Sequence, residues 1–249
     1  EDGELHWMDV DESTLEYAPV WYGGRGVFGG GSSNVIDYIT IATTGDATDF
    51  GDLSVSRQHL GSCSNGTRGV FGGGSTSSDV IDYITIGSLG NATDFGNLSV
   101  SREKLAACSD GTTGVFGGGE GASLYNVIDY ITIASTGNAL DFGNLSVSRA
   151  KLGSCSDSTR GLWGGGTNGG IYDTIDYVTI ATTGNASDFG NLSVGRHFLS
   201  SCSDGTKGVF GGGDSSDVID YITIATLGNA SDFGNLSVSR SKLAATSGD

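Results

Sequence analysis

Hydrophobic positions along the chain fall into short runs that recur in a fixed order, with turn residues between them. In the repeat that begins near residue 60, the runs cover residues 60–64, 69–72, 80–86 and 93–98. The third run, VIDYITI, is rich in the β-branched and aromatic residues that strands favour. Short apolar runs bounded by glycine, asparagine and serine predict antiparallel strands. Each repeat is therefore expected to form four strands.

A glycine-rich segment, written RGVFGGG at residues 68–74, sets the period of this pattern. Five copies occur 43 to 47 residues apart, and their first glycines are Gly26, Gly69, Gly114, Gly161 and Gly208. Four strands in that length are typical of a propeller blade, whereas the coils of a β-helix are shorter. The sequence predicts an all-β fold, a five-bladed β-propeller of four-stranded antiparallel blades.

The two ends of the chain must then close the ring. The first strand of the repeat occurs at 60, 105, 152, 199 and 243, while the other three begin at 26 and end at 236. The simplest closure pairs this C-terminal strand, residues 242–246, with residues 26–29 of the first blade, which removes an exposed edge. The alternative uses residues 17–21 as the missing strand. We expect an N-terminal arm at residues 1–22 and the propeller at residues 23–249.

Composition and charge narrow the classes of partner. The 44 glycines and single proline recur at fixed places beside apolar residues, which indicates an ordered chain. Twelve basic and 29 acidic residues give a formal net charge of -17, which repels nucleic acid and anionic membranes. No run of 18 apolar residues occurs, so we expect no membrane insertion.

Four cysteines occupy one repeat position. Equivalent positions in successive blades lie too far apart for a disulfide, so we expect four free, small, buried thiols. They are Cys63, Cys108, Cys155 and Cys202.

Two charged positions also recur in every repeat. A ring of arginines could bind an anionic ligand such as a sulfated glycan. The structural interpretation is favoured, in which each arginine bonds a carboxylate or carbonyl of a neighbouring blade. The structural repeat positions are Arg57, Arg102, Arg149, Arg196 and Arg240, with Asp37, Asp82, Asp129, Asp176 and Asp220.

One further set of residues resembles a known family. An arginine precedes the inner strand at Arg57, a double glycine ends the second strand at residues 72–73, and Tyr83 and Phe95 stand in the third and fourth strands. This set resembles the kelch-type propeller repeat, with phenylalanine where that repeat usually has tryptophan. The resemblance covers residues 25–249 and implies the fold without fixing an activity.

A narrower resemblance concerns the amino-acid sequence of the repeat itself. The copy DYITIASTGNA at residues 129–139, followed by DFGNL at 141–145, resembles repeat proteins of marine bacteriophages and large viruses. The segment WYG at residues 21–23 resembles the opening of such proteins. The resemblance implies a structural or host-contact component of a virion or an extracellular appendage.

The connections between the second and third strands vary most in length. The first is short, at residues 32–34, and those at residues 120–126 and 167–174 are long. Variation at one point of a repeat marks one exposed face, where binding specificity is built. Aromatic and asparagine side chains suit sugar stacking and hydrogen bonding. The candidate ligand-binding residues are Tyr125, Asn168, Ile171 and Tyr172.

Asparagines and aspartates in the turns allow two further interpretations. Residues 46–52 and 185–191 offer oxygen ligands of the kind calcium prefers, but no copy has the spacing of an established calcium loop. No cofactor is expected. The sequons are possible glycosylation sites in a eukaryotic secreted protein, at Asn65, Asn91, Asn97, Asn144, Asn185, Asn191, Asn229 and Asn235.

Catalytic motifs are not evident in the sequence. His6, His59 and His197 lie outside metal-ligand spacing, and the near-identical copies offer no unlike residues for one cleft. We therefore expect a non-enzymatic structural or binding module whose partners are neighbouring subunits or a surface glycan. One alternative is a glycan-active hydrolase or lyase with Asp37 and its equivalents as acid and base. Another is an intracellular kelch-type adaptor.

Overall fold

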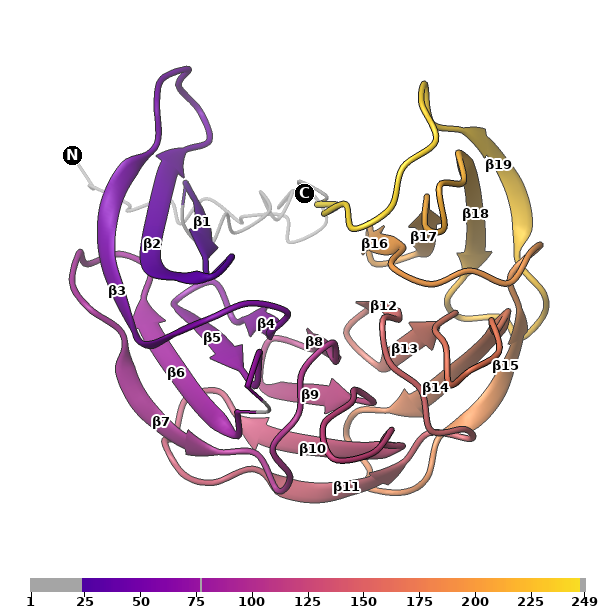
Figure 1. Cartoon of the computed structure of the whole chain (residues 1–249), viewed down its shortest axis with the longest axis horizontal. Coiled ribbons are helices and arrows are strands. Elements are labelled where there is room, and N and C mark those ends of the chain that lie inside the picture. The colour runs from indigo at the N-terminus through magenta and orange to yellow at the C-terminus, as the bar shows by residue number, and fades with distance from the viewer. Residues whose placement is uncertain (1–23, 77, 247–249) are drawn as a thin grey trace, which may run out of the picture.

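The computed structural model describes residues 24–76 and 78–246, which form strands and turns and no helix. Five antiparallel sheets follow one another around an open arc (Figure 1). Sheet 1 contains β1 (Arg25–Gly29), β2 (Ser33–Thr40) and β3 (Thr48–Arg57). Sheet 2 contains β4 (Gly61–Ser64), β5 (Arg68–Gly72), β6 (Val80–Thr85) and β7 (Thr93–Asn97).

The remaining three sheets repeat this order. Sheet 3 contains β8 (Ala106–Ser109), β9 (Thr113–Gly117), β10 (Val127–Thr132) and β11 (Leu140–Asn144). Sheet 4 contains β12 (Gly153–Ser156), β13 (Arg160–Gly164), β14 (Thr174–Thr179) and β15 (Ser187–Asn191). Sheet 5 contains β16 (Ser200–Ser203), β17 (Lys207–Gly211), β18 (Val218–Thr223) and β19 (Ser231–Asn235). The predicted all-β fold of repeated antiparallel sheets is confirmed.

The predicted closure of the ring is not present in the described structure. Sheet 1 has three strands, and residues 241–246 form no strand against β1. Sheets 1 and 5 stand on either side of the opening of the arc (Figure 1). No strand of sheet 5 pairs with a strand of sheet 1 in the described structure. The predicted N-terminal arm and the alternative strand at residues 17–21 lie outside the described residues.

Each of the three inner sheets buries both of its faces, which explains the nearly continuous apolar character of its third strand. Ile81 and Tyr83 of β6 pack toward sheet 3, while Ile84 of β6 and Ile86 just after it pack toward sheet 1. Side chains alternate between the faces of a strand, so a strand held between two neighbouring sheets needs apolar residues at consecutive positions.

In sheets 1 to 4, a glycine at the end of the second strand admits an aromatic ring from the next sheet. A Cβ atom at Gly72 would lie 2.7 Å from Cε1 of Phe116, whose side chain is fully buried. At Gly117 a Cβ would lie 2.6 Å from Trp163, and at Gly164 it would lie 2.7 Å from Phe210. The absence of a side chain at these glycines therefore allows the sheets to pack closely.

The outer edges of the sheets are joined by backbone hydrogen bonds. Gly137 and Ala139, in the turn before β11, donate their N–H groups to the carbonyls of Phe95 and Asn97 in β7 at 2.7 and 2.8 Å. Gly96 has a φ of 142°, and a Cβ there would lie 2.4 Å from the carbonyl oxygen of Gly137. The conformation and the close approach both require glycine at this position.

The inner strands are linked by serine hydroxyls. Ser109 Oγ donates to the carbonyl of Ser64 at 2.7 Å, and Ser156 Oγ donates to that of Ser109 at 2.8 Å. Ser203 Oγ donates to the carbonyl of Ser156 at 2.6 Å. Small polar side chains thus connect strands that are about 45 residues apart in the sequence.

A buried ion pair lies in each of the four junctions between consecutive sheets. Arg102, which follows sheet 2, donates from Nη2 to Asp129 Oδ2 at 2.9 Å and to the carbonyl of Phe116 at 3.1 Å in sheet 3. Both charged side chains have an exposed fraction of 0%. Burial lowers the pKa of Arg102, and the charge of Asp129 opposes that shift. The equivalent pairs are Arg57–Asp82, Arg149–Asp176 and Arg196–Asp220.

We predict that breaking one ion pair destabilises the fold strongly. Replacing Arg102 by methionine or Asp129 by leucine should each lower the free energy of unfolding by about 3–5 kcal/mol, because the remaining charge stays buried without a partner. The double variant should lose at least about 1 kcal/mol less than the sum of the two losses. Urea unfolding of the four proteins measures this coupling. Strictly additive losses would contradict the pairing.

We also predict that Gly96→Ala lowers the free energy of unfolding by at least about 2 kcal/mol, because it adds strain at positive φ and a clash with Gly137. Gly87→Ala is the matched control, since its Cβ would meet open space. The control should stay within about 0.5 kcal/mol of the parent protein in the same urea titration. Equal losses in the two variants would contradict the close approach.

Candidate functional site

One face of the arc carries the connections that vary in length. We call it the loop face, formed by the connections from the second to the third strand of each sheet and by the segments that lead into the next inner strand. Glu120 forms an isolated bridge with Glu103, and Thr167 forms one with Ala150. Ser75 donates its backbone N–H to the carbonyl of Gln58 at 2.7 Å. These bonds hold each variable loop beside the segment that enters the same sheet.

Three of the predicted ligand-binding residues lie in the connection between β13 and β14. The hydroxyl of Tyr172 donates to Asn168 Oδ1 at 2.9 Å. Ile171 lies between them in sequence and is 57% exposed. The loop is closed by a bridge between Thr167 and Ile171. The structure thus brings these three residues together in one ordered loop.

The fourth predicted residue, Tyr125, lies at the equivalent place in sheet 3. Its N–H donates to the carbonyl of Gly119 at 2.9 Å, and its carbonyl accepts from the N–H of Arg149 at 3.1 Å. Tyr172 has the same two backbone bonds one repeat later, with Gly166 and Arg196. Tyr125 is half-buried and has no hydrogen bond to the other three residues in the described structure.

The sequence reasoning missed a ring of residues at the centre of the loop face. Each residue after the first donates its backbone N–H to the carbonyl of the equivalent residue one repeat earlier, at 2.8 to 2.9 Å. We call this set the central ring. Its five members are His59, Lys104, Lys151, Phe198 and Lys242.

The central ring surrounds a cavity of about 250 Å³. One leucine follows each ring residue in the sequence, and these leucines also line the cavity: Leu60, Leu105, Leu152, Leu199 and Leu243. The cavity thus combines charged or aromatic groups with an apolar lining. The sequence did contain a signal for the central ring: its members stand two positions after each repeated arginine, and three of the five are lysine.

The three lysines of the central ring have different surroundings. Lys104 forms ion pairs with Glu103 and Glu120, and its hydrogen bond to Glu120 raises its pKa. Lys151 and Lys242 place their Nζ atoms 5.2 and 5.1 Å from the ring centroid of Phe198. Two ammonium groups thus lie near one aromatic ring, and neither has an ion pair within residues 24–76 and 78–246.

A second cavity, also of about 250 Å³, is lined by the inner strands and includes the four cysteines. These thiols are free; Cys108 and Cys155 are buried, whereas Cys63 and Cys202 are half-buried. The expectation of four buried thiols is corrected: β4 contacts the inner strand β8 and β16 contacts the inner strand β12, so each has such a neighbour on one side only in the described structure. Burial raises the pKa of Cys108 to about 12. It also raises the pKa of Cys155 and Cys202.

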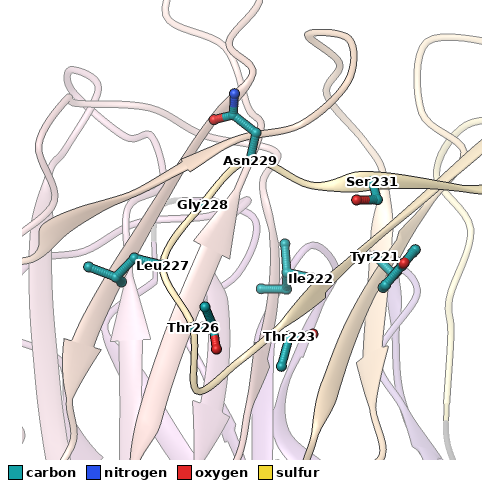
Figure 2. Close-up of a pocket in the computed structure, with 8 residues that line it drawn as sticks. All are labelled: Tyr221, Ile222, Thr223, Thr226, Leu227, Gly228, Asn229 and Ser231. Carbon is teal, nitrogen blue, oxygen red and sulfur yellow. The ribbon is translucent and has the colours of Figure 1, made fainter.

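A third cavity is lined by the turn between β18 and β19 and by the residues of the two strands that flank it (Figure 2). Its lining of threonine, serine, asparagine, leucine and isoleucine contains one titratable side chain, Tyr221. None of the three cavities is lined by a carboxylate. No group of three or more histidine, cysteine, aspartate or glutamate residues suited to a metal ion occurs in the described part of the chain.

Several asparagines of the sequons have structural contacts in the turns. The side-chain oxygens of Asn91, Asn185 and Asn229 accept backbone N–H bonds from the preceding sheet at 3.0 to 3.1 Å. Asn65 Oδ1 accepts from the N–H groups of Thr67 and Arg68. The contacts of Asn91, Asn185 and Asn229 join neighbouring sheets, a role that is independent of glycosylation.

Comparison with known proteins leaves the family of this chain open. No protein-family model matches the chain, and no curated protein sequence matches it. Within the described residues, no helix is long and apolar enough to cross a membrane.

The thiols should differ in reactivity in the native protein. The thiolate is the nucleophile, so the raised pKa and burial of Cys108 and Cys155 should make their alkylation by iodoacetamide at pH 8 slower than that of the half-buried Cys202. Peptide mass spectrometry follows each site over time. Labelling in urea, where all four sites should react alike, is the control. Native labelling of Cys108 as fast as in urea would contradict the structure.

Proposed function

We propose that this protein is a non-enzymatic structural and binding module, a kelch-like β-propeller of a virion or extracellular appendage. Its loop face contacts a host glycan or a neighbouring subunit. The observation that carries this proposal is that conserved packing and variable length occur at different places in the repeat. The repeated charged residues are buried between sheets, whereas variation in loop length is confined to one face.

The same burial argues against the glycan-active alternative. Asp82, Asp129, Asp176 and Asp220 have fully buried side chains held by arginine, which leaves these four carboxylates inaccessible to a substrate. A glycosidase needs two carboxyl groups flanking the scissile bond in an open site. The three cavities provide no such pair.

We further propose that the five sheets are the blades of one propeller whose ring closes between sheets 5 and 1. The two end sheets present complementary halves of the interface that recurs inside the arc. Phe28 on sheet 1 is 58% exposed, although its equivalents Phe116 and Phe210 are fully buried against glycine. Gly211 on sheet 5 has no aromatic ring against it. Phe28 therefore suits the open site at Gly211.

The charged residues of the end sheets are complementary in the same way. The carbonyl of Arg240 accepts from Gly213 at 2.9 Å, as that of Arg196 accepts from Gly166 at 3.0 Å. The exposed Arg240 and the half-buried Asp37 form no ion pair in the described structure. Closure would bring this fifth pair together. Residues 242–246 would then supply the fourth strand of sheet 1, beside β1.

A charge exchange tests the closure. Asp37→Arg and Arg240→Asp should each lower the free energy of unfolding by about 2 kcal/mol or more, because each places like charges in the closed interface. The double variant should recover most of that loss by restoring opposite charges. Urea unfolding, with sedimentation to establish a monomer, makes the comparison. Single variants as stable as the parent would contradict the closed ring.

Glycan binding is tested on an array of immobilised glycans. The parent protein should bind a subset of them without releasing products. Tyr172→Phe, which removes the hydrogen bond to Asn168, should weaken binding about five- to thirtyfold, the effect of 1–2 kcal/mol. Leu227→Ala, at an exposed residue of the β18–β19 turn, is the control and should bind like the parent.

Two results would contradict this proposal. Release of shortened glycans would show an enzyme. A protein that binds no glycan and does not copurify with a particle or filament from its source would have neither of the two proposed partners.

A further inference from the structure

The five residues of the central ring adopt an unfavourable backbone conformation. Its five residues have φ values between 54° and 63°, the left-handed region that costs a residue other than glycine about 1–2 kcal/mol. Glycine would make the same backbone hydrogen bonds at lower cost. The chain nevertheless carries a large side chain at all five positions. The side chains are therefore what these positions contribute to the loop face.

The charges around the cavity leave two cations unpaired. Glu103 and Glu120 are held by Lys104, and Glu103 also lies 3.6 Å from His59. The carboxylate of Asp214 lies against Nδ1 of His197, the residue before Phe198. Lys151 and Lys242 have no carboxylate partner in the part of the chain that the structure describes. In a protein of net charge -17, two unpaired ammonium groups beside one cavity favour an anion there.

The apolar part of the cavity lining restricts the ligand further than its charge does. The half-buried Phe198 ring and the five leucines offer apolar surface to whatever occupies the cavity. Inorganic phosphate would use the ammonium groups and leave this surface without a contact. The volume of about 250 Å³ is smaller than the roughly 300–1,000 Å³ of pockets for drug-sized ligands. The occupant is thus a small anion with a carbon framework, the size of one sugar ring.

We propose that the cavity inside the central ring binds an acidic sugar unit. Its carboxylate lies between Lys151 and Lys242, and its C–H surface packs on Phe198 and the leucines. Charge-assisted hydrogen bonds from the two lysines supply the discrimination against neutral sugars. This inference rests on the proposed glycan-binding function and names the ligand class.

Calorimetric titration with sodium glucuronate tests the proposal, with glucose and inorganic phosphate as comparisons. The parent protein should bind glucuronate in a salt-sensitive manner and bind neither comparison measurably. Lys151→Met and Lys242→Met should each weaken glucuronate binding about tenfold, because each removes one charged hydrogen-bond donor. Lys207→Met is the matched control, since Lys207 Nζ lies 5.0 Å from the ring centroid of Tyr221, outside the cavity. Thermal unfolding verifies that the variants are folded.

Three results would overturn the proposal: absence of glucuronate binding, equal binding of phosphate, or lysine variants that bind glucuronate like Lys207→Met. A glucuronate-terminated glycan on the array distinguishes a chain-linked sugar from the free acid, because the same two lysine variants should lose it. Array binding that survives in both lysine variants but is lost in Tyr172→Phe would retain the proposed function and reject the acidic-sugar site.

Discussion

The buried arginine–aspartate pair between consecutive sheets is the interaction on which the rest of the structure depends. A desolvated charge is costly unless its partner stands within hydrogen-bond distance, so the pair admits one placement of each sheet on the next. In that placement Phe116 lies over Gly72, and the turn before β11 reaches the outer strand of sheet 2. The ion pair therefore fixes the register between sheets, whereas apolar packing supplies most of the stability.

This arrangement makes the architecture a chain of nearest-neighbour contacts, as in other repeat proteins. Residues that take part in the interface must stay alike from copy to copy, whereas a surface loop can change length at small cost. The loop face is consequently where the repeats differ, and the central ring lies among those loops. The two end sheets are the exception, because one face of each has no neighbouring sheet in the arc. Phe28 on sheet 1 and Phe233 on sheet 5 are exposed for this reason.

Much of the fold could be predicted because its signals are local. The run VIDYITI becomes β6 to within one residue, and the glycines of the RGVFGGG segment fall where a strand must end or a ring must fit. The central ring could not be predicted in the same way. Its members are about 45 residues apart, differ in chemistry, and meet only because each inner strand is entered by the same left-handed residue. Positive φ at a lysine has no signature in the sequence.

The sequence by itself determined the strands, their order within each sheet and the loops that vary, since periodicity and turn chemistry act over a few residues. Tertiary structure decided which charged side chains are buried in ion pairs between sheets and which line a cavity where a ligand could contact them. Asp129 and Lys151 look equally polar in the sequence, yet one is buried against Arg102 and the other lines a cavity. Tertiary structure also decided which copies of a repeated residue are buried: Phe28 and Phe233 on the two end sheets are exposed, because it is packing against a neighbouring sheet that buries their equivalents, and no single repeat encodes that neighbour.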